Sequence, residues 1–140
     1  MIIITDVNIL LSAFIKDSTT REIIVKSGQD LCFPEPSLQT IRKHQPLILK
    51  KSGLSEEEFS AIWNNIFHFI RIIPVEELKP FWTEATEIMG SIDAEDVPFV
   101  AAALSQESAV IWSDDKHFDQ QQKVMNLKTA DMVKLFRRED

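Results

Sequence analysis

Short apolar runs alternate along this chain with segments whose apolar residues recur every three or four positions. Residues 2–5 and 109–112 are continuous apolar runs, which are typical of strands buried inside a parallel sheet, and residues 31–33 fit the same pattern. Residues 71–75 fit an edge strand, because Pro74 lacks the amide proton that a central strand needs. The alternation of such runs with helical segments predicts an α/β fold.

Helix-start signals separate these runs. Ser55 precedes three glutamates, and a hydroxyl cap followed by acids favours a helix N-terminus. Thr19 and Glu22 have the spacing of a capping box, which predicts a helix that starts there and ends near Gly28. We expect further helices over residues 8–15, 81–89 and 129–136, one that opens at residues 36–37, and one that begins around residues 93–96.

The helix after Ser55 carries an apolar stripe at helical spacing, which predicts one buried face. The stripe comprises Phe59, Ile62, Trp63, Ile66 and Phe67. Packing in the core is the preferred interpretation of this stripe, including Trp63. A homodimer surface made of Phe59, Trp63, Ile66, Phe67 and Ile70 is the alternative.

A length of 140 residues fits one domain, residues 1–140, with a sizeable core. No apolar run approaches the ~20 residues that span a bilayer, and the first residues lack the basic segment of a secretory signal. The single cysteine, Cys32, cannot form an internal disulfide, which suits a reducing compartment. These features favour a cytoplasmic protein that does not contact a membrane.

The formal net charge of −7 argues against a protein that binds nucleic acid through a broad basic face. The charge is compatible with a nucleic-acid enzyme, because divalent cations would cancel negative charge at the site itself. It is equally compatible with a basic partner peptide.

Acidic residues follow the places where apolar runs end. Asp6 comes directly after the first run, Asp114 and Asp115 follow the run at 109–112, and Asp93 and Asp96 stand at a predicted helix start. The carboxyl ends of parallel strands converge on one crevice, so these acids are expected to meet in space. Carboxylates gathered in this way repel one another unless a cation holds them. The pattern therefore predicts a divalent-metal site and phosphodiester chemistry.

Each acid also has a simpler interpretation, because Asp commonly caps helices and pairs of Asp are common in turns. The occurrence of several such acids at strand ends and a helix start favours the joint metal site. His44, His68 and His117 share no ligand spacing, so we do not expect zinc.

Four segments, in order along the chain, resemble the PIN-domain ribonuclease family, whose best-known members are toxins of type II toxin–antitoxin systems. They are residues 3–13, 34–44, 93–104 and 110–118. The resemblance implies a single-domain three-layer α/β/α sandwich with a mainly parallel central sheet. It also implies an endoribonuclease that hydrolyses RNA phosphodiester bonds with Mg²⁺ or Mn²⁺. Phosphatases of the haloacid-dehalogenase type fit less well, because Asn8 replaces a second acid and Lys116 follows the final acid pair.

The resemblance assigns roles to individual residues. Asp6, Asp96 and Asp115 match the catalytic and principal metal-binding acids, and Asp93 matches an accessory metal ligand. Further accessory positions are Asn8, Glu35, Ser113 and Asp114. Local positive charge for the RNA substrate would come from Arg42, Lys43 and Lys116. An antitoxin-like protein partner and a homodimer are also compatible with the family.

One position departs from the family pattern. The family usually has a glutamate in the helix after the second strand, and Thr40 stands there, with Gln39 before it. Glu35 is the nearest acid, but five residues of helix correspond to roughly 7 Å. The site could use Glu35, bind one metal weakly, or have lost cleavage altogether. A PIN-like fold that works as a binding or regulatory module is therefore the alternative function.

Overall fold

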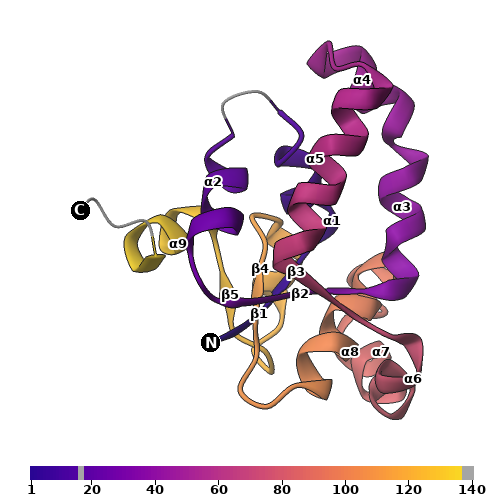
Figure 1. Cartoon of the computed structure of the whole chain (residues 1–140). Coiled ribbons are helices and arrows are strands. Elements are labelled where there is room, and N and C mark those ends of the chain that lie inside the picture. The colour runs from indigo at the N-terminus through magenta and orange to yellow at the C-terminus, as the bar shows by residue number, and fades with distance from the viewer. Residues whose placement is uncertain (16–17, 137–140) are drawn as a thin grey trace.

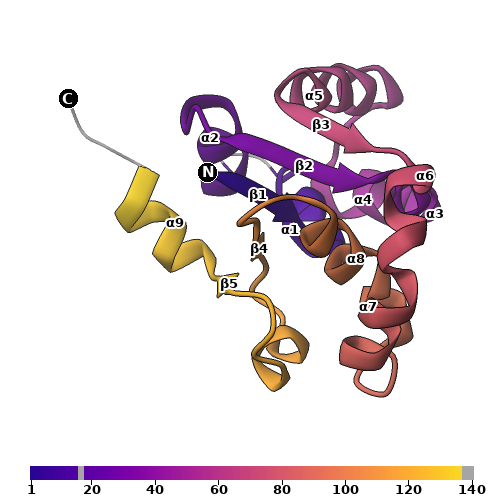
Figure 2. The same ribbon diagram turned by 90° about the horizontal axis from the view of Figure 1, so that it is seen from below.

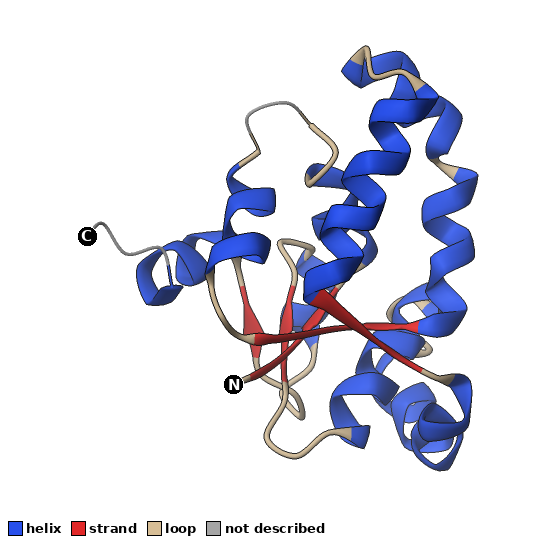
Figure 3. Ribbon diagram, viewed as in Figure 1, coloured by secondary structure: helices blue, strands red, loops and turns tan. Residues whose placement is uncertain are grey.

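Five parallel strands form the sheet at the centre of the computed structural model, which describes residues 1–15 and 18–136. The spatial order is β3-β2-β1-β4-β5, and every neighbouring pair is parallel. The strands are β1 (Ile2–Thr5), β2 (Asp30–Pro34), β3 (Ile70–Ile73), β4 (Val110–Trp112) and β5 (Asn126–Leu127). All connections are therefore crossovers, and helices cover both faces of the sheet (Figure 3).

The helices form two layers (Figure 1). One layer contains α1 (Val7–Ser12), α2 (Thr19–Lys26), α3 (Leu38–Lys43), α4 (Gln45–Ser52), α5 (Glu56–Phe69) and α9 (Thr129–Phe136). The other layer contains α6 (Val75–Leu78), α7 (Trp82–Met89) and α8 (Val97–Ser105). The 3₁₀ turns are η1 (Glu35–Ser37), η2 (Lys79–Phe81), η3 (Ala94–Asp96) and η4 (Lys116–Gln120). This arrangement confirms the predicted α/β sandwich with a parallel central sheet.

The middle of the sheet explains the continuous apolar runs. Ile3 and Ile4 of β1 are fully buried, because strands flank β1 on both sides and helices cover both faces. Helix α8 packs directly on β1, β2 and β4, as Figure 2 shows from below. Six of its nine residues are buried, which anchors its first turn beside the ends of the strands.

Two helix starts show how accurately capping residues can be predicted from the sequence. The Ser55 hydroxyl accepts from the Glu58 amide and Glu58 reaches back to the Ser55 amide, so the capping box of α5 is present. The predicted Thr19 cap is wrong by one residue: the Ser18 hydroxyl accepts from the Arg21 amide instead. Ser and Thr both cap helices, with Ser the better of the two, and the capping-box spacing of Thr19 and Glu22 pointed to the weaker candidate.

Several elements differ from the predicted ones. The helix expected from residues 36–37 is divided into η1, α3 and α4, and the break between α3 and α4 falls at His44. Pro46 lies in the first turn of α4, where its missing amide proton costs least. The short elements α6 and β5 were not predicted, because two to four residues are too few to show a period.

The apolar stripe of α5 faces the core. Phe59 and Ile66 are buried, and the Phe59 ring stacks on Phe14 at a centroid distance of 4.4 Å. The Trp63 ring packs against Phe67 at 4.6 Å. The core interpretation of the stripe is therefore confirmed. No helix within the described ranges is both long and apolar enough to cross a membrane.

Candidate metal centre

The pairing of β1 with β4 brings two distant acidic segments together. Thr5 is the register partner of Trp112, and the amide of Asp6 donates to the Trp112 carbonyl over 3.3 Å. Residues directly after the two strands therefore meet at the carboxyl edge of the sheet. This is the edge at which open α/β sheets bind ligands.

Asp6 is the most buried acid of this edge, with an exposed fraction of 3%. Its Oδ1 accepts from the Ile9 amide over 2.8 Å, which caps α1, and its Oδ2 accepts from the Ser113 hydroxyl. Burial raises the pKa of Asp6 from 3.8 to about 6, against the lowering effect of these hydrogen bonds and with a further rise from Asp96 and Asp115. A cation at this edge would relieve the cost of the buried charge.

Asp93 and Asp96 approach from the other layer, at the start of α8. Asp93 Oδ1 accepts from the Glu95 amide over 2.9 Å, so this carboxylate also caps η3. Asp96 makes no capping hydrogen bond, which leaves its carboxylate for the site. Burial raises the pKa of Asp96 to about 6; the hydrogen bond from His117 opposes this rise, and Asp93 and Asp115 add to it.

Asp115 completes the set from the loop after β4. Its amide donates to the Ser113 hydroxyl over 3.0 Å, and its Oδ1 accepts from the His117 amide over 2.9 Å. Ser113 is fully buried. One hydroxyl thus links the acid after β1 to the acid after β4.

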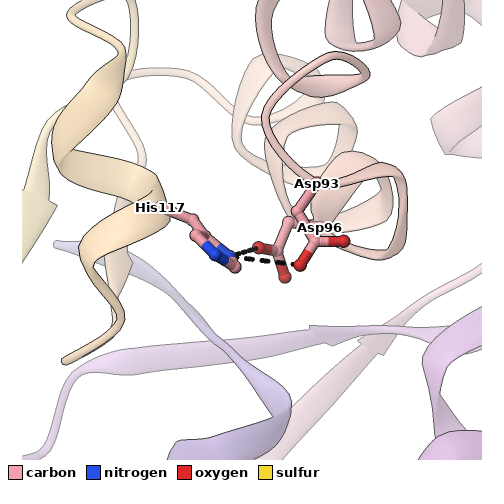
Figure 4. Close-up of side chains that lie close together, drawn as sticks. All are labelled: Asp93, Asp96 and His117. Atoms are coloured by element: carbon pink, nitrogen blue, oxygen red, sulfur yellow. Dashed lines mark hydrogen bonds and ion pairs between the residues drawn. The ribbon is translucent and has the colours of Figure 1, made fainter.

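A histidine that the sequence analysis did not place here lies among these acids. His117 Nδ1 lies 3.1 Å from Asp93 Oδ2, 3.2 Å from Asp96 Oδ2 and 3.4 Å from Asp115 Oδ1 (Figure 4 shows the first two contacts). The hydrogen bond to Asp96 and the three carboxylates raise the pKa of His117. The only available signal was its position two residues after Asp115, because the acids at η3 are more than twenty residues earlier.

A small cleft with a volume of about 180 Å³ lies at this edge, and Asp6, Ser113 and His117 do not line it. Asp93, Asp96 and Asp115 line it together with Asn8, Thr40 and His44, among others. One ligand atom from each of Asp93, Asp96 and His117 lies within 4.8 Å of the others. Carboxylate oxygens suit Mg²⁺ and Mn²⁺, and the crowding of these acids together with the raised pKa of Asp96 fits a site that accepts a divalent cation.

Two predicted accessory acids point elsewhere. Glu35 Oε1 accepts from the Val75 amide over 3.0 Å, and Glu35 does not line the cleft. Asp114 accepts from both the amide and the hydroxyl of Thr129, each over 2.7 Å, so it ties the loop after β4 to the start of α9. Both carboxylates satisfy backbone donors at element starts, a use that a pattern of acids cannot distinguish from metal binding.

The cleft contains the position where the family pattern has its missing acid. Thr40 lines it, whereas Gln39 does not. The three basic residues predicted to contact RNA do not share one position. The Arg42 guanidinium lies 4.8 Å above the Trp63 ring and lines a separate depression. Lys43 and Lys116 are exposed and form no ion pair with any residue that the structure describes.

Comparison with known proteins agrees with this geometry. The family model described as PIN domain matches residues 4–132, which includes every acid of the cleft. None of the curated proteins matches the chain. Because the match covers most of the 140 residues, and the fold and acidic edge are those expected, the chain belongs to the PIN domain family, a family of nuclease fold.

Proposed function

We propose that this protein is a divalent-metal-dependent endoribonuclease. One observation carries the proposal: Asp93, Asp96 and Asp115 gather around His117 in a PIN-domain fold, and the Ser113 hydroxyl links Asp6 to Asp115 beside them. Two of them are buried enough to raise their pKa to about 6. Such a cluster destabilises the metal-free fold, which favours a functional role for it.

Asp6, Asp96 and Asp115 would hold Mg²⁺ or Mn²⁺, with Asp93 as an accessory ligand. The bound ion would supply a water activated for attack on a phosphodiester and charge to stabilise the leaving oxygen. Ser113 fixes the orientation of Asp6 by donating to one carboxylate oxygen, while the Ile9 amide holds the other. Nδ1 of His117 lies among the carboxylates, which raise its pKa and so favour its protonated form in the metal-free protein.

The RNA preference rests on the four segments that resemble the ribonuclease family. Lys43 and Lys116 are the exposed cations near the cleft that could contact phosphates, which adds affinity without sequence information. We further propose that the protein is a cytoplasmic toxin and that its antitoxin covers the acidic cleft. We also propose that the protein forms a homodimer. Co-expression of the neighbouring gene product tests the toxin role by relief of growth arrest.

The second candidate function is a PIN fold that binds RNA or protein without cleaving. Its support is specific: Thr40 lines the cleft where the family has glutamate, and Glu35 is engaged with the Val75 amide instead of replacing it. If this second function is correct, we expect the protein to bind a partner without metal and to cleave no RNA.

The deciding experiment compares the parent with Asp96→Asn. Mn²⁺ binding is measured by isothermal titration calorimetry, and the same samples are assayed on pooled single-stranded RNA with and without EDTA. The proposal expects binding and Mn²⁺-dependent cleavage in the parent and loss of both in the variant. Folded parent protein without cleavage would leave the binding module as the better account.

A further inference from the structure

A second cleft adjoins the acidic one. It lies between α1 and α4, has a volume of about 380 Å³ and is larger than the acidic cleft. Its apolar wall includes Leu11, Ile15, Leu47 and Ile48. Ile15 is 58% exposed and Leu47 47% exposed, so the wall is open to solvent in the isolated chain.

Two polar residues line both clefts. Asn8 and His44 line both the acidic cleft and the apolar cleft, so these two residues form the boundary between them. The Asn8 side-chain amide forms no hydrogen bond with the residues described. It can therefore donate and accept toward a bound group.

The orientation of His44 is fixed from within α3. Its Nδ1 lies 2.7 Å from the Thr40 carbonyl oxygen, which can only accept, so Nδ1 carries the proton. Nε2 is left to bond a ligand. Because Thr40 itself lines the acidic cleft, this contact places His44 one helical turn from the missing acid.

Positive charge lies at the far side of the same cavity. Lys51 lines the apolar cleft and forms no ion pair with any described residue. A polynucleotide that passed from Lys51 over the apolar wall to the acids would meet a cation, an apolar surface and then the reaction site. This order matches the alternation of phosphate and base in a single strand.

We propose that the cleft between α1 and α4 is a nucleobase subsite, which seats the unpaired base next to the phosphodiester held at the acids. The inference rests on the proposed function for the identity of that neighbouring site. The volume falls in the ~300–1,000 Å³ range of small-ligand sites.

The test uses Leu47→Gln, which keeps side-chain size and charge but makes the wall polar. Met125→Gln is the matched control, because Met125 is 65% exposed, precedes the edge strand β5 and does not line the cleft. Affinity for a labelled single-stranded RNA of about eight nucleotides is measured by fluorescence anisotropy in EDTA. Cleavage of the same RNA in Mn²⁺ then gives KM and kcat separately.

We expect Leu47→Gln to weaken RNA affinity about fivefold and to raise KM similarly, with kcat retained, because it removes apolar contact to the base. Met125→Gln should change neither quantity. Lys51→Gln, at an exposed position, provides a second variant with the same expected direction. If Leu47→Gln and Lys51→Gln both bind and cleave like the parent, the subsite is refuted while the nuclease stands.

Failure of the proposed function gives a different result. If the parent never cleaves RNA, but Leu47→Gln binds RNA more weakly than the parent does, the nuclease proposal is refuted and the subsite is supported. Unchanged RNA affinity combined with loss of self-association or of a protein partner would identify the cleft as a protein-docking surface and overturn the nucleobase proposal.

Discussion

The Ser113 hydroxyl donates to Asp6 Oδ2 across 107 positions of sequence, and the same hydroxyl accepts from the Asp115 amide. Ser113 is therefore a buried link between the acid after β1 and the acid after β4. Its two hydrogen bonds fix the relative positions of these acids without any metal. The carboxyl edge is thus preorganised by a neutral group, while its charges stay uncompensated apart from His117.

The charge on Asp6 should cost the metal-free protein stability. Its pKa is raised from 3.8 to about 6, so above pH 6 the folded state is disfavoured by on the order of 3 kcal/mol. Asp6→Asn can still accept from the Ile9 amide, and its NH₂ group would then donate to the Ser113 hydroxyl oxygen instead of accepting from it. We expect Asp6→Asn to be more stable by about 1–3 kcal/mol at pH 7.5 in urea denaturation, yet unable to bind Mn²⁺. A destabilised variant would contradict this account.

The pH dependence should have opposite signs for stability and for metal binding. Asp6 and Asp96 both have raised pKa values of about 6, so they favour the metal-free fold below pH 4 and lose that contribution as the pH rises through 6. Metal binding needs both carboxylates ionised. We expect the Mn²⁺ affinity to fall about tenfold or more between pH 7.5 and 5.5.

Calorimetry in buffers of different ionisation enthalpy measures the protons released. Binding near pH 6 should release protons from Asp6, Asp96 and His117, whose pKa is also raised. A Mn²⁺ affinity that is constant over this range, with no proton release, would mean that these acids do not form the site.

Regular patterns along the sequence predict the framework well. The strands at 2–5 and 110–112, the capping box at Ser55 and the buried stripe of α5 all follow from local periodicity and cap chemistry. The approach of Asp6 to Asp115 also follows, because strand ends meet at one edge of a parallel sheet, whereas Asp93 and Asp96 reach this edge only through the packing of α8.

The sequence pattern does not show which partner each acidic side chain contacts. Glu35, Asp114 and Asp96 are all acids near element ends, but only Asp96 lines the cleft. The other two accept from the amides of Val75 and Thr129, which lie forty and fifteen residues away. His117 was missed for the same reason, since its partners come from a different layer of the sandwich.

The missing family acid provides a gain-of-function prediction. Thr40 lines the cleft on α3, so Thr40→Glu would place a carboxylate near Asp96 and Asp115. We expect it to tighten Mn²⁺ binding about tenfold and to raise cleavage at limiting metal, while lowering metal-free stability through repulsion. Thr40→Gln is the matched control, with the same length and no charge. Equal titration curves for the two variants would show that position 40 does not contact the ion.

The adjacent residues Asp114 and Asp115 should separate structure from function. Asp114 accepts twice from Thr129 at the start of α9, and losing such a cap costs about 1–2 kcal/mol. We therefore expect Asp114→Ala to lower the melting temperature but keep the parent's Mn²⁺ affinity. Asp115→Asn should do the reverse, because Asp115 lines the cleft and its amide analogue can still accept from the His117 amide. Thermal melts and calorimetric titration of both variants, side by side, measure this. Loss of Mn²⁺ binding in a folded Asp114→Ala protein would show that Asp114 contributes to the metal site after all.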